Sequence, residues 1–460
     1  MIRGQAGRGW LLLVVLAAAT VRAAEMDAFL APRGGFAADN RERTITMPDG
    51  SEQPGTMENA VLELIQRAGA GSTIHLAMYS FSARHIQDAL IQAARRGATV
   101  LLILDGVNEF AEKPRRELLD KIAAAGVNIP VKVVTAERMK ELGRTLAHTG
   151  GRVFTGSMHE KFGVFEYGDG APAAVFAGSA NLSYSSDSMF AENRIRVIGD
   201  DRLAMTLEDE FAILWEHYGT CAVETCPELP RPSARTPDDD GTLTFITNST
   251  PDDGGTVMTG QVIRLLGKAG IKGGSVAAAM FYFTGKPIAD ALLRLAAEHP
   301  GSTLRILLDQ GQLDREEDEE VLGQWLEEEA ERLRLRNLEI RYRWEPDAYG
   351  WDEERTPPGP AKVFALAPFL MHHKFFIVND SILVNGSFNW TALGDRNLEN
   401  LLVVNGSEPR ARRLVDRFAA EFEELWRHQS IGGPAGRAVK RMIYEKLMEE
   451  HSRGEAATKP

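Results

Sequence analysis

Apolar residues recur along this 460-residue chain in one order that is used twice. Each time, a stretch with helical spacing is followed by a strand-length apolar run, a second helical stretch and a second apolar run. The first series occupies residues 57–68, 72–82, 84–96 and 99–104, and the second occupies 262–266, 275–284, 287–298 and 304–308. Strand, helix and strand at these lengths predict a right-handed βαβ unit with a buried parallel pair in each half.

The two series also match residue by residue. Ala77-Met78-Tyr79 corresponds to Ala279-Met280-Phe281, and both second strands end in an aspartate, Asp105 and Asp309. The offset is 202 residues at the methionines and 204 at the aspartates, a drift small enough to indicate duplication of one α/β unit. We interpret Tyr79 and Phe281 as core residues.

A second repeated pattern carries polar residues that are suited to chemistry. Residues 371–391 contain two short apolar runs around a polar break at 379–381, which predicts a hairpin. Its first strand begins with a histidine and a lysine two positions apart, which share one face of a strand. Its end carries Gly-Ser-x-Asn, and a Glu-Asn pair follows. The matched residues are His159, Lys161, Ser179, Asn181 and Glu192 in the first copy, and His372, Lys374, Ser387, Asn389 and Glu399 in the second.

These patterns divide the chain. We expect a signal peptide over 1–23, an irregular segment over 24–56, a first domain over 57–226 and a proline-rich linker over 227–241. A second domain follows over 242–430, and residues 431–460 form a C-terminal helix and tail. Residues 314–334 predict an acidic solvated helix, and the basic-aromatic run 341–344 fits either a substrate entrance or a half-buried strand.

The first 23 residues place two arginines before an apolar run too short to span a membrane, followed by small residues. We therefore expect export to a bacterial periplasm or to the medium, with retention of the leader as an anchor as the alternative. The net charge is −13, and loss of three arginines with the leader makes it −16. A chain this acidic attracts nucleic acid poorly unless a local basic cleft intervenes. Cys221 and Cys226, the two cysteines, predict a disulfide in an exported protein, with two free thiols as the alternative.

The doubled His-x-Lys motif with Gly-Ser-x-Asn resembles the phospholipase D superfamily over nearly the whole mature chain. The resemblance implies two similar α/β sandwich domains packed about a pseudo-twofold axis, with both motifs in one active site of a monomer. It also implies that His159 is the nucleophile, that His372 is the acid/base, and that Glu192 and Glu399 orient the histidines.

The residues suit phosphodiester chemistry in their own right. Lys161 and Lys374 would hold the anionic oxygens, assisted by Ser179, Asn181, Ser387 and Asn389. One neutral imidazole would attack phosphorus while the other protonates the leaving oxygen. Since the lysines supply the positive charge, we expect no metal and no other cofactor.

The family usually has an aspartate five residues after each motif lysine, whereas this chain has Glu166 and Asn379. Three functions therefore remain open. The first is hydrolysis of phospholipid headgroups at a membrane surface, which the acidity favours. The second is an exported nuclease that acts on DNA or RNA. The third is a catalytically weak protein that binds phosphodiesters.

Overall fold

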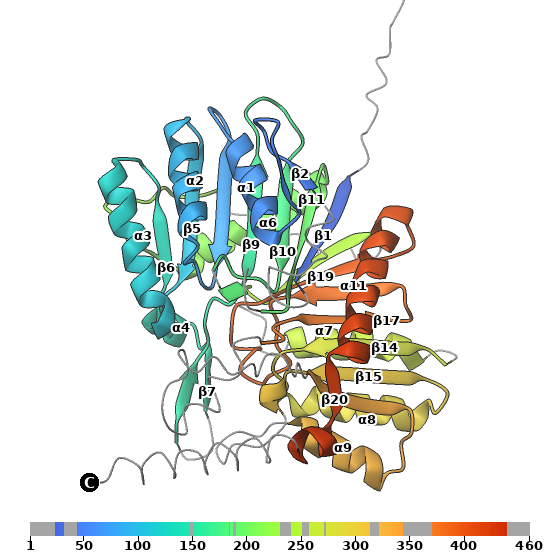
Figure 1. The fold of residues 1–460 in the computed structure, drawn as a ribbon. Coiled ribbons are helices and arrows are strands. Elements are labelled where there is room, and N and C mark those ends of the chain that lie inside the picture. The colour runs from blue at the N-terminus through green and yellow to red at the C-terminus, as the bar shows by residue number, and fades with distance from the viewer. Residues whose placement is uncertain are drawn as a thin grey trace, which may run out of the picture.

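The computed structural model describes residues 24–31, 44–147, 151–183, 185–186, 190–230, 241–250, 257–270, 273–312, 322–343 and 370–438. These residues form two halves, each built on one eight-stranded mixed sheet, with an identical strand arrangement (Figure 1). In spatial order the first sheet contains β1 (Glu25–Ala31), β11 (Glu192–Ile198), β10 (Ala174–Gly178), β9 (Lys161–Glu166), β4 (Thr73–Met78), β5 (Thr99–Asp105), β6 (Val131–Val134) and β12 (Gly219–Cys221). The second contains β13 (Leu243–Thr247), β19 (Asn400–Asn405), β18 (Ile382–Gly386), β17 (Lys374–Val378), β14 (Ser275–Met280), β15 (Thr303–Leu308), β16 (Leu338–Arg343) and β20 (Ser430–Gly432).

The predicted βαβ units are present. Strands β4 and β5 pair in parallel, as do β14 and β15. The connecting helices, α2 (Arg84–Arg95) and α8 (Lys286–Glu298), lie on the outer faces together with α1 (Met57–Arg67), α3 (Glu112–Ala125), α7 (Val257–Leu266) and α9 (Leu322–Arg332). The predicted hairpin of the second half is β17–β18, and its counterpart is β9–β10.

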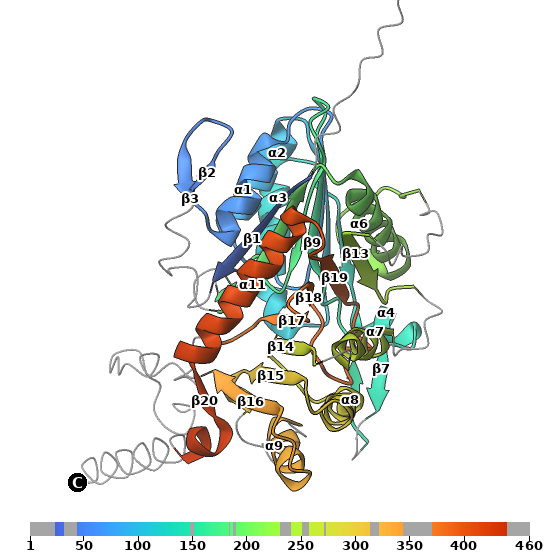
Figure 2. The same cartoon turned by 90° about the vertical axis from the view of Figure 1, so that its right-hand side faces the viewer.

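The two sheets face each other across a shared apolar core that contains residues of both halves. Two helices cross between the halves in reciprocal positions. Helix α6 (Asp201–Ile213) of the first half packs on β13, whereas α11 (Pro409–His428) of the second half packs on β1 (Figure 2). The aromatic pair Phe162–Phe245, with ring centroids 5.9 Å apart, joins the halves directly. This exchange fixes the pseudo-twofold arrangement that brings the two motifs together.

Local sequence sets the helix ends. Thr56 begins α1 as an N-cap whose hydroxyl accepts a hydrogen bond from the Asn59 N–H at 3.0 Å. Helix α3 ends at Gly126, which has a φ of 64°, a left-handed conformation that glycine adopts without strain. Further short elements include β2 (Thr44–Thr46), β3 (Glu52–Pro54), α4 (Ala136–Glu141), β7 (Thr145–Ala147), β8 (Val153–Thr155) and a π-helical turn at Leu214–Tyr218.

Two boundaries differ from the prediction. Residues 24–56 were expected to be irregular, yet β1 is an edge strand antiparallel to β11, and β2–β3 forms a hairpin. The short β1 segment shows no strong alternation of apolar and polar residues, so the sequence did not predict a strand. Pairing with β11 and cover by α11 stabilise it instead. The second domain was expected to end at residue 430, but β20 continues its sheet against β16.

Other sequence predictions have mixed outcomes. Cys221 and Cys226 form the expected disulfide, with a Cα–Cα distance of 6.0 Å. The run 341–343 lies in β16 with Tyr342 and Arg343 buried, which supports the strand interpretation. The signal peptide, most of the linker, residues 344–369 and most of the tail lie outside the described residues. Among the described helices, we find none that combines the length and apolarity needed to cross a membrane.

Candidate active site

Each His-x-Lys motif is joined by backbone hydrogen bonds to a segment of the other half. His159 N–H donates to the Leu398 carbonyl at 2.9 Å, immediately before Glu399. His372 N–H donates to the Ala191 carbonyl at 2.9 Å, immediately before Glu192. Each histidine is therefore hydrogen-bonded to the segment that carries the glutamate of the other copy.

The side chains follow the same exchange. His159 Nδ1 lies 3.0 Å from Glu399 Oε2, and His372 Nδ1 is hydrogen-bonded to Glu192 Oε1. Both glutamates are fully buried, and both histidines are almost fully buried. Because Nδ1 of each imidazole is engaged, Nε2 is the nitrogen left for chemistry. The sequence predicted the four residues, and the structure brings them together as two crosswise pairs.

The lysines lie beside the histidines in equivalent positions. Lys374 Nζ donates to the His372 carbonyl at 2.8 Å, and Lys161 Nζ donates to the His159 carbonyl. Burial lowers the pKa of Lys161 to about 8. Burial, followed by repulsion from Lys161, lowers the pKa of Lys374 well below its usual value. Burial and mutual repulsion thus disfavour the charged forms of the two lysines, and an anionic ligand would stabilise those forms.

The histidine pairs also have shifted titrations. Burial lowers the pKa of His159 to about 4, and burial together with the neighbouring lysines lowers that of His372 well below its usual value. Burial raises the pKa of Glu192 to about 7. Near neutral pH His159 is therefore an unprotonated imidazole, which is the form that can act as a nucleophile.

The predicted anion-binding residues lie next to these pairs. Ser179 Oγ accepts the Asn193 N–H at 3.1 Å, and Ser387 Oγ accepts the Asn400 N–H at 2.9 Å and also bonds to Glu399. Both serines are fully buried, so in this structure they support the strands and the glutamate. Their phosphate-binding role stays a prediction.

The two asparagines are differently engaged. Asn181 Oδ1 accepts the Ser80 N–H at 3.2 Å. Asn389 Oδ1 is buried and has no hydrogen-bond partner among the described residues. That oxygen can only accept a hydrogen bond, so it gives no support for contact with an anion. The phosphate-binding role of both asparagines stays a prediction.

Tyr79 and Phe281 are site residues and not simple core residues, which corrects the interpretation from sequence. The Tyr79 ring meets the His159 ring edge-on at 4.6 Å, and Lys161 Nζ lies 4.8 Å from its centre. The Phe281 ring lies tilted against the His372 ring at 4.6 Å, and Lys374 Nζ lies 5.2 Å from its centre. Their matched positions, directly after β4 and β14, were the feature of the sequence that could have indicated a place in the site.

Asp105 and Asp309, which marked the duplication, hold the motifs in place. Asp105 Oδ1 accepts the Met158 N–H at 2.9 Å, and Asp309 Oδ2 accepts the Met371 N–H at 2.7 Å. Each aspartate therefore fixes the residue before a motif histidine. Burial raises the pKa of Asp105 to about 6. Sequence reasoning gave these residues no role, although two strand-terminal acids at matched positions indicated one.

The central residues of the two motifs, Glu160 and His373, point away from the reacting nitrogens and differ between the copies. His373 is fully buried and bonds to Asn193 at 3.0 Å and to Glu421 at 3.2 Å. Glu160 bonds to Asn400 at 3.1 Å, and burial next to another carboxyl raises its pKa. The bonds to Asn193 and Asn400 also cross between the halves, whereas the bond to Glu421 lies within the second half.

The two departures from the family pattern lie far from the reacting groups. Glu166 is exposed at the opposite end of β9 from Lys161, five residues or about 17 Å away. Asn379 occupies the turn after β17 with a φ of 53°, and its Oδ1 accepts the Ser275 N–H at 3.1 Å. Neither side chain can contact a phosphate held by the lysines.

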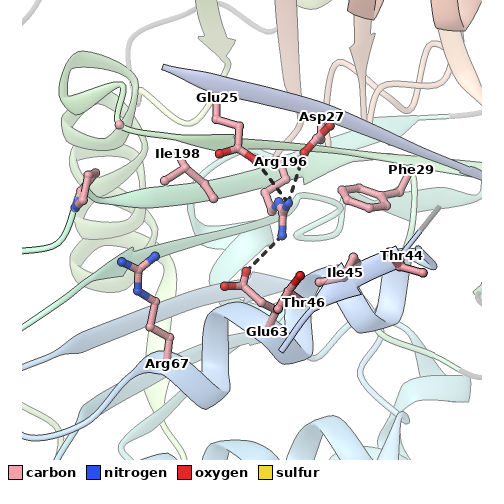
Figure 3. Close-up of a pocket in the computed structure, with 12 residues that line it drawn as sticks. Glu25, Asp27, Phe29, Thr44, Ile45, Thr46, Glu63, Arg67, Arg196 and Ile198 are labelled. Atoms are coloured by element: carbon pink, nitrogen blue, oxygen red, sulfur yellow. Dashed lines mark hydrogen bonds and ion pairs between the residues drawn. The ribbon is translucent and has the colours of Figure 1, made fainter. Parts of the chain in front are cut away.

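A cavity of about 480 Å³ lies elsewhere, between β1, β2 and α1 (Figure 3). Its centre is Arg196, paired with Glu63 at 3.0 Å and with Asp27 at 3.1 Å. Arg196 is four residues along β11 from Glu192, or about 13 Å. This cluster therefore does not belong to the candidate active site.

Comparison with known proteins identifies the family. A family model described as "Cardiolipin synthase, PLD-like domain" matches residues 61–215 and 262–426. Mitochondrial cardiolipin hydrolase of Homo sapiens is 34% identical over 92 residues, which cover 16% of this chain and 34% of that protein. The corresponding protein of Chlamydomonas reinhardtii is 44% identical over 57 residues, which cover 12% of this chain and 23% of that protein. The chain thus spans about a third or less of these curated relatives.

A solved structure of phosphatidylserine synthase from Haemophilus influenzae Rd KW20 has a TM-score of 0.52 and 12% identity, and the match covers 87% of this chain and 91% of that one. This likeness concerns the fold. The family model, in contrast, matches well over half of the chain, once in each half. The chain belongs to the phospholipase D superfamily, and it carries two domains of that family in one polypeptide.

Proposed function

We propose that this protein is a phosphodiesterase that acts through a phosphohistidine and hydrolyses the headgroup phosphodiester of phospholipids. The observation that carries the proposal is the pair of crosswise histidine–glutamate contacts beside two buried lysines. Such a site holds a monoanion between two cations and offers one imidazole to each side of phosphorus.

In the first step His159 Nε2 attacks phosphorus, and the bond from phosphorus to the leaving oxygen breaks. The His372–Glu192 pair gives that oxygen a proton. In the second step water attacks phosphorus, the phosphorus–nitrogen bond breaks, and the same pair takes the proton from water. Lys161 and Lys374 hold the non-bridging oxygens throughout, and for this reason we expect turnover in EDTA.

Two observations support a lipid as the substrate. The mature net charge of −16 disfavours a polyanion, and the curated relatives are named cardiolipin hydrolases.

The test is a parallel assay in EDTA. One arm follows headgroup release from vesicles of phosphatidylcholine, phosphatidylethanolamine and cardiolipin, and the other follows cleavage of single- and double-stranded DNA. We expect release from vesicles and its loss in His159→Ala. DNA cleavage alone would instead assign a nuclease, and binding without turnover in either arm would leave a phosphodiester-binding protein. Unchanged turnover in His159→Ala would refute the phosphohistidine step.

We also propose that the protein is exported after removal of residues 1–23. The disulfide between Cys221 and Cys226 supports an oxidising compartment. N-terminal sequencing of protein from the periplasmic fraction tests this: a mature terminus near residue 24 is expected, whereas a cytosolic protein with an intact leader would contradict it.

A further inference from the structure

The two histidine–glutamate pairs are related by the pseudo-twofold axis, yet the residue two positions before each glutamate differs. It is Phe190 before Glu192 and Asn397 before Glu399. The Phe190 ring lies 5.7 Å from the His372 ring and offers no hydrogen bond. Asn397, in contrast, donates from Nδ2 to Glu399 Oε1 at 2.9 Å. The surroundings of the two glutamates therefore differ at this position.

Asn397 bridges the two halves of the molecule. Its Oδ1 accepts the Ser157 N–H at 2.9 Å, in the segment that leads to His159. Its amide thus contacts both the carboxylate partner of His159 and the backbone that carries His159. The strand itself does not depend on this side chain, because Asn248 separately bonds to the Asn397 carbonyl and to the Glu399 N–H, each at 2.9 Å.

Glu399 consequently has three donors, namely His159, Ser387 and Asn397. These donors hold the carboxylate in place against the His159 ring. A carboxylate oxygen that accepts from His159 Nδ1–H keeps the proton on that nitrogen and leaves the Nε2 lone pair free to attack. The other pair differs, since burial raises the pKa of Glu192 to about 7 and that pair can hold an additional proton near neutral pH.

We propose that Asn397 is a positioning residue that makes the two pairs unequal, so that His159 attacks phosphorus while the His372–Glu192 pair transfers the proton. This inference rests on the proposed phosphodiesterase function. Asn397 itself contacts no reacting atom and acts through Glu399. Phe190 at the equivalent position leaves the second pair without the amide donor.

Two substitutions separate positioning from simple packing. Asn397→Ala removes the whole amide, whereas Asn397→Asp keeps the shape and the acceptor for Ser157 but replaces the donor with a negative charge. Loss of one charge-assisted hydrogen bond predicts a fall in kcat of about 10- to 100-fold for Asn397→Ala. We expect a larger fall for Asn397→Asp, although it is the more conservative change in shape. A packing role would give the opposite order.

Asn337→Ala is the matched control. Asn337 is also a partly buried asparagine, and its amide bonds to the Ala296 carbonyl at 3.0 Å and to the His299 carbonyl at 3.1 Å, far from the site in the outer part of the second half. We expect this variant to lose stability while keeping the kcat and the pH profile of the native protein. The acidic limb of the profile should move to higher pH in Asn397→Ala alone.

A second measurement does not need turnover. Long-range ¹⁵N–¹H NMR correlations of the histidine rings report which nitrogen of His159 carries the proton, with His159→Gln used for assignment. The native protein should show an Nδ1–H tautomer from pH 5.5 to 8, and Asn397→Ala should show a mixture of tautomers. An unchanged tautomer in Asn397→Ala, or milder kinetics in Asn397→Asp than in Asn397→Ala, would overturn the inference. A native protein inactive on both substrates would refute the proposed function, while the NMR result would still decide the role of Asn397.

Discussion

The exchange of glutamates between the two halves predicts a measurable coupling free energy between residues of different halves. Both oxygens of Glu399 lie within hydrogen-bonding distance of His159 Nδ1, at 2.9 and 3.0 Å, although the residues are 240 positions apart in the chain. A hydrogen bond to a buried carboxylate contributes about 1.5–3 kcal/mol. In a double-mutant cycle of His159→Asn and Glu399→Gln, we therefore expect a coupling energy of that size.

The control cycle pairs His159→Asn with Glu192→Gln, the glutamate of the same copy. His159 bonds to Glu399, and Glu192 bonds to His372, so these two changes should be additive within about 0.5 kcal/mol. Urea unfolding at pH 7 supplies the free energies. Because the halves share one apolar core, a single transition is expected. A large coupling within one copy and none between copies would refute the crosswise arrangement.

Three further predictions concern pH, the family departures and the disulfide. Activity should fall as pH rises through about 7, because the His372–Glu192 pair loses the proton that it gives to the leaving group. Activity should also fall as pH drops toward 4, because His159 becomes protonated. Initial rates from pH 4 to 9 check both limbs. Glu166→Asp and Asn379→Asp should change kcat less than twofold, since both positions lie at the far end of their strands, and a larger gain would mean that they act on the site. Replacing both cysteines with serine should lower the free energy of unfolding by about 2 kcal/mol, the chain-entropy value for a loop this short, with no change in kcat. Urea titration with and without reductant measures that loss, and equal stability would show that the bridge adds nothing.

The symmetric arrangement also shows why inactivity does not follow from the departures. The motif histidine, lysine, serine, asparagine and glutamate are present in both copies, whereas Glu166 and Asn379 serve a strand end and a turn. Asn379 suits that turn, because asparagine tolerates a positive φ better than most residues. Glu166 and Asn379 therefore give no reason to interpret the chain as a weak phosphodiester-binding protein.

The sequence by itself determined much of this protein. Periodicity placed the βαβ units, and the repeated order of His, Lys, Ser, Asn and Glu identified the residues that meet at the interface. These are local patterns, and duplication displays each of them twice. The edge strand β1 was not predicted, because pairing with the distant strand β11, and not its own residue pattern, makes it a strand.

Only the tertiary structure decided the partners. A repeat suggests that each histidine uses the glutamate of its own copy. In the structure Met158 pairs with Leu398 and Met371 pairs with Ala191, so each histidine reaches the glutamate of the other half. The same geometry brings Tyr79 and Phe281 beside the histidines and joins Asn397 to the segment before His159. Sequence spacing carries no information on contacts between residues 180 or 240 positions apart, because those contacts depend on how the two sheets pack.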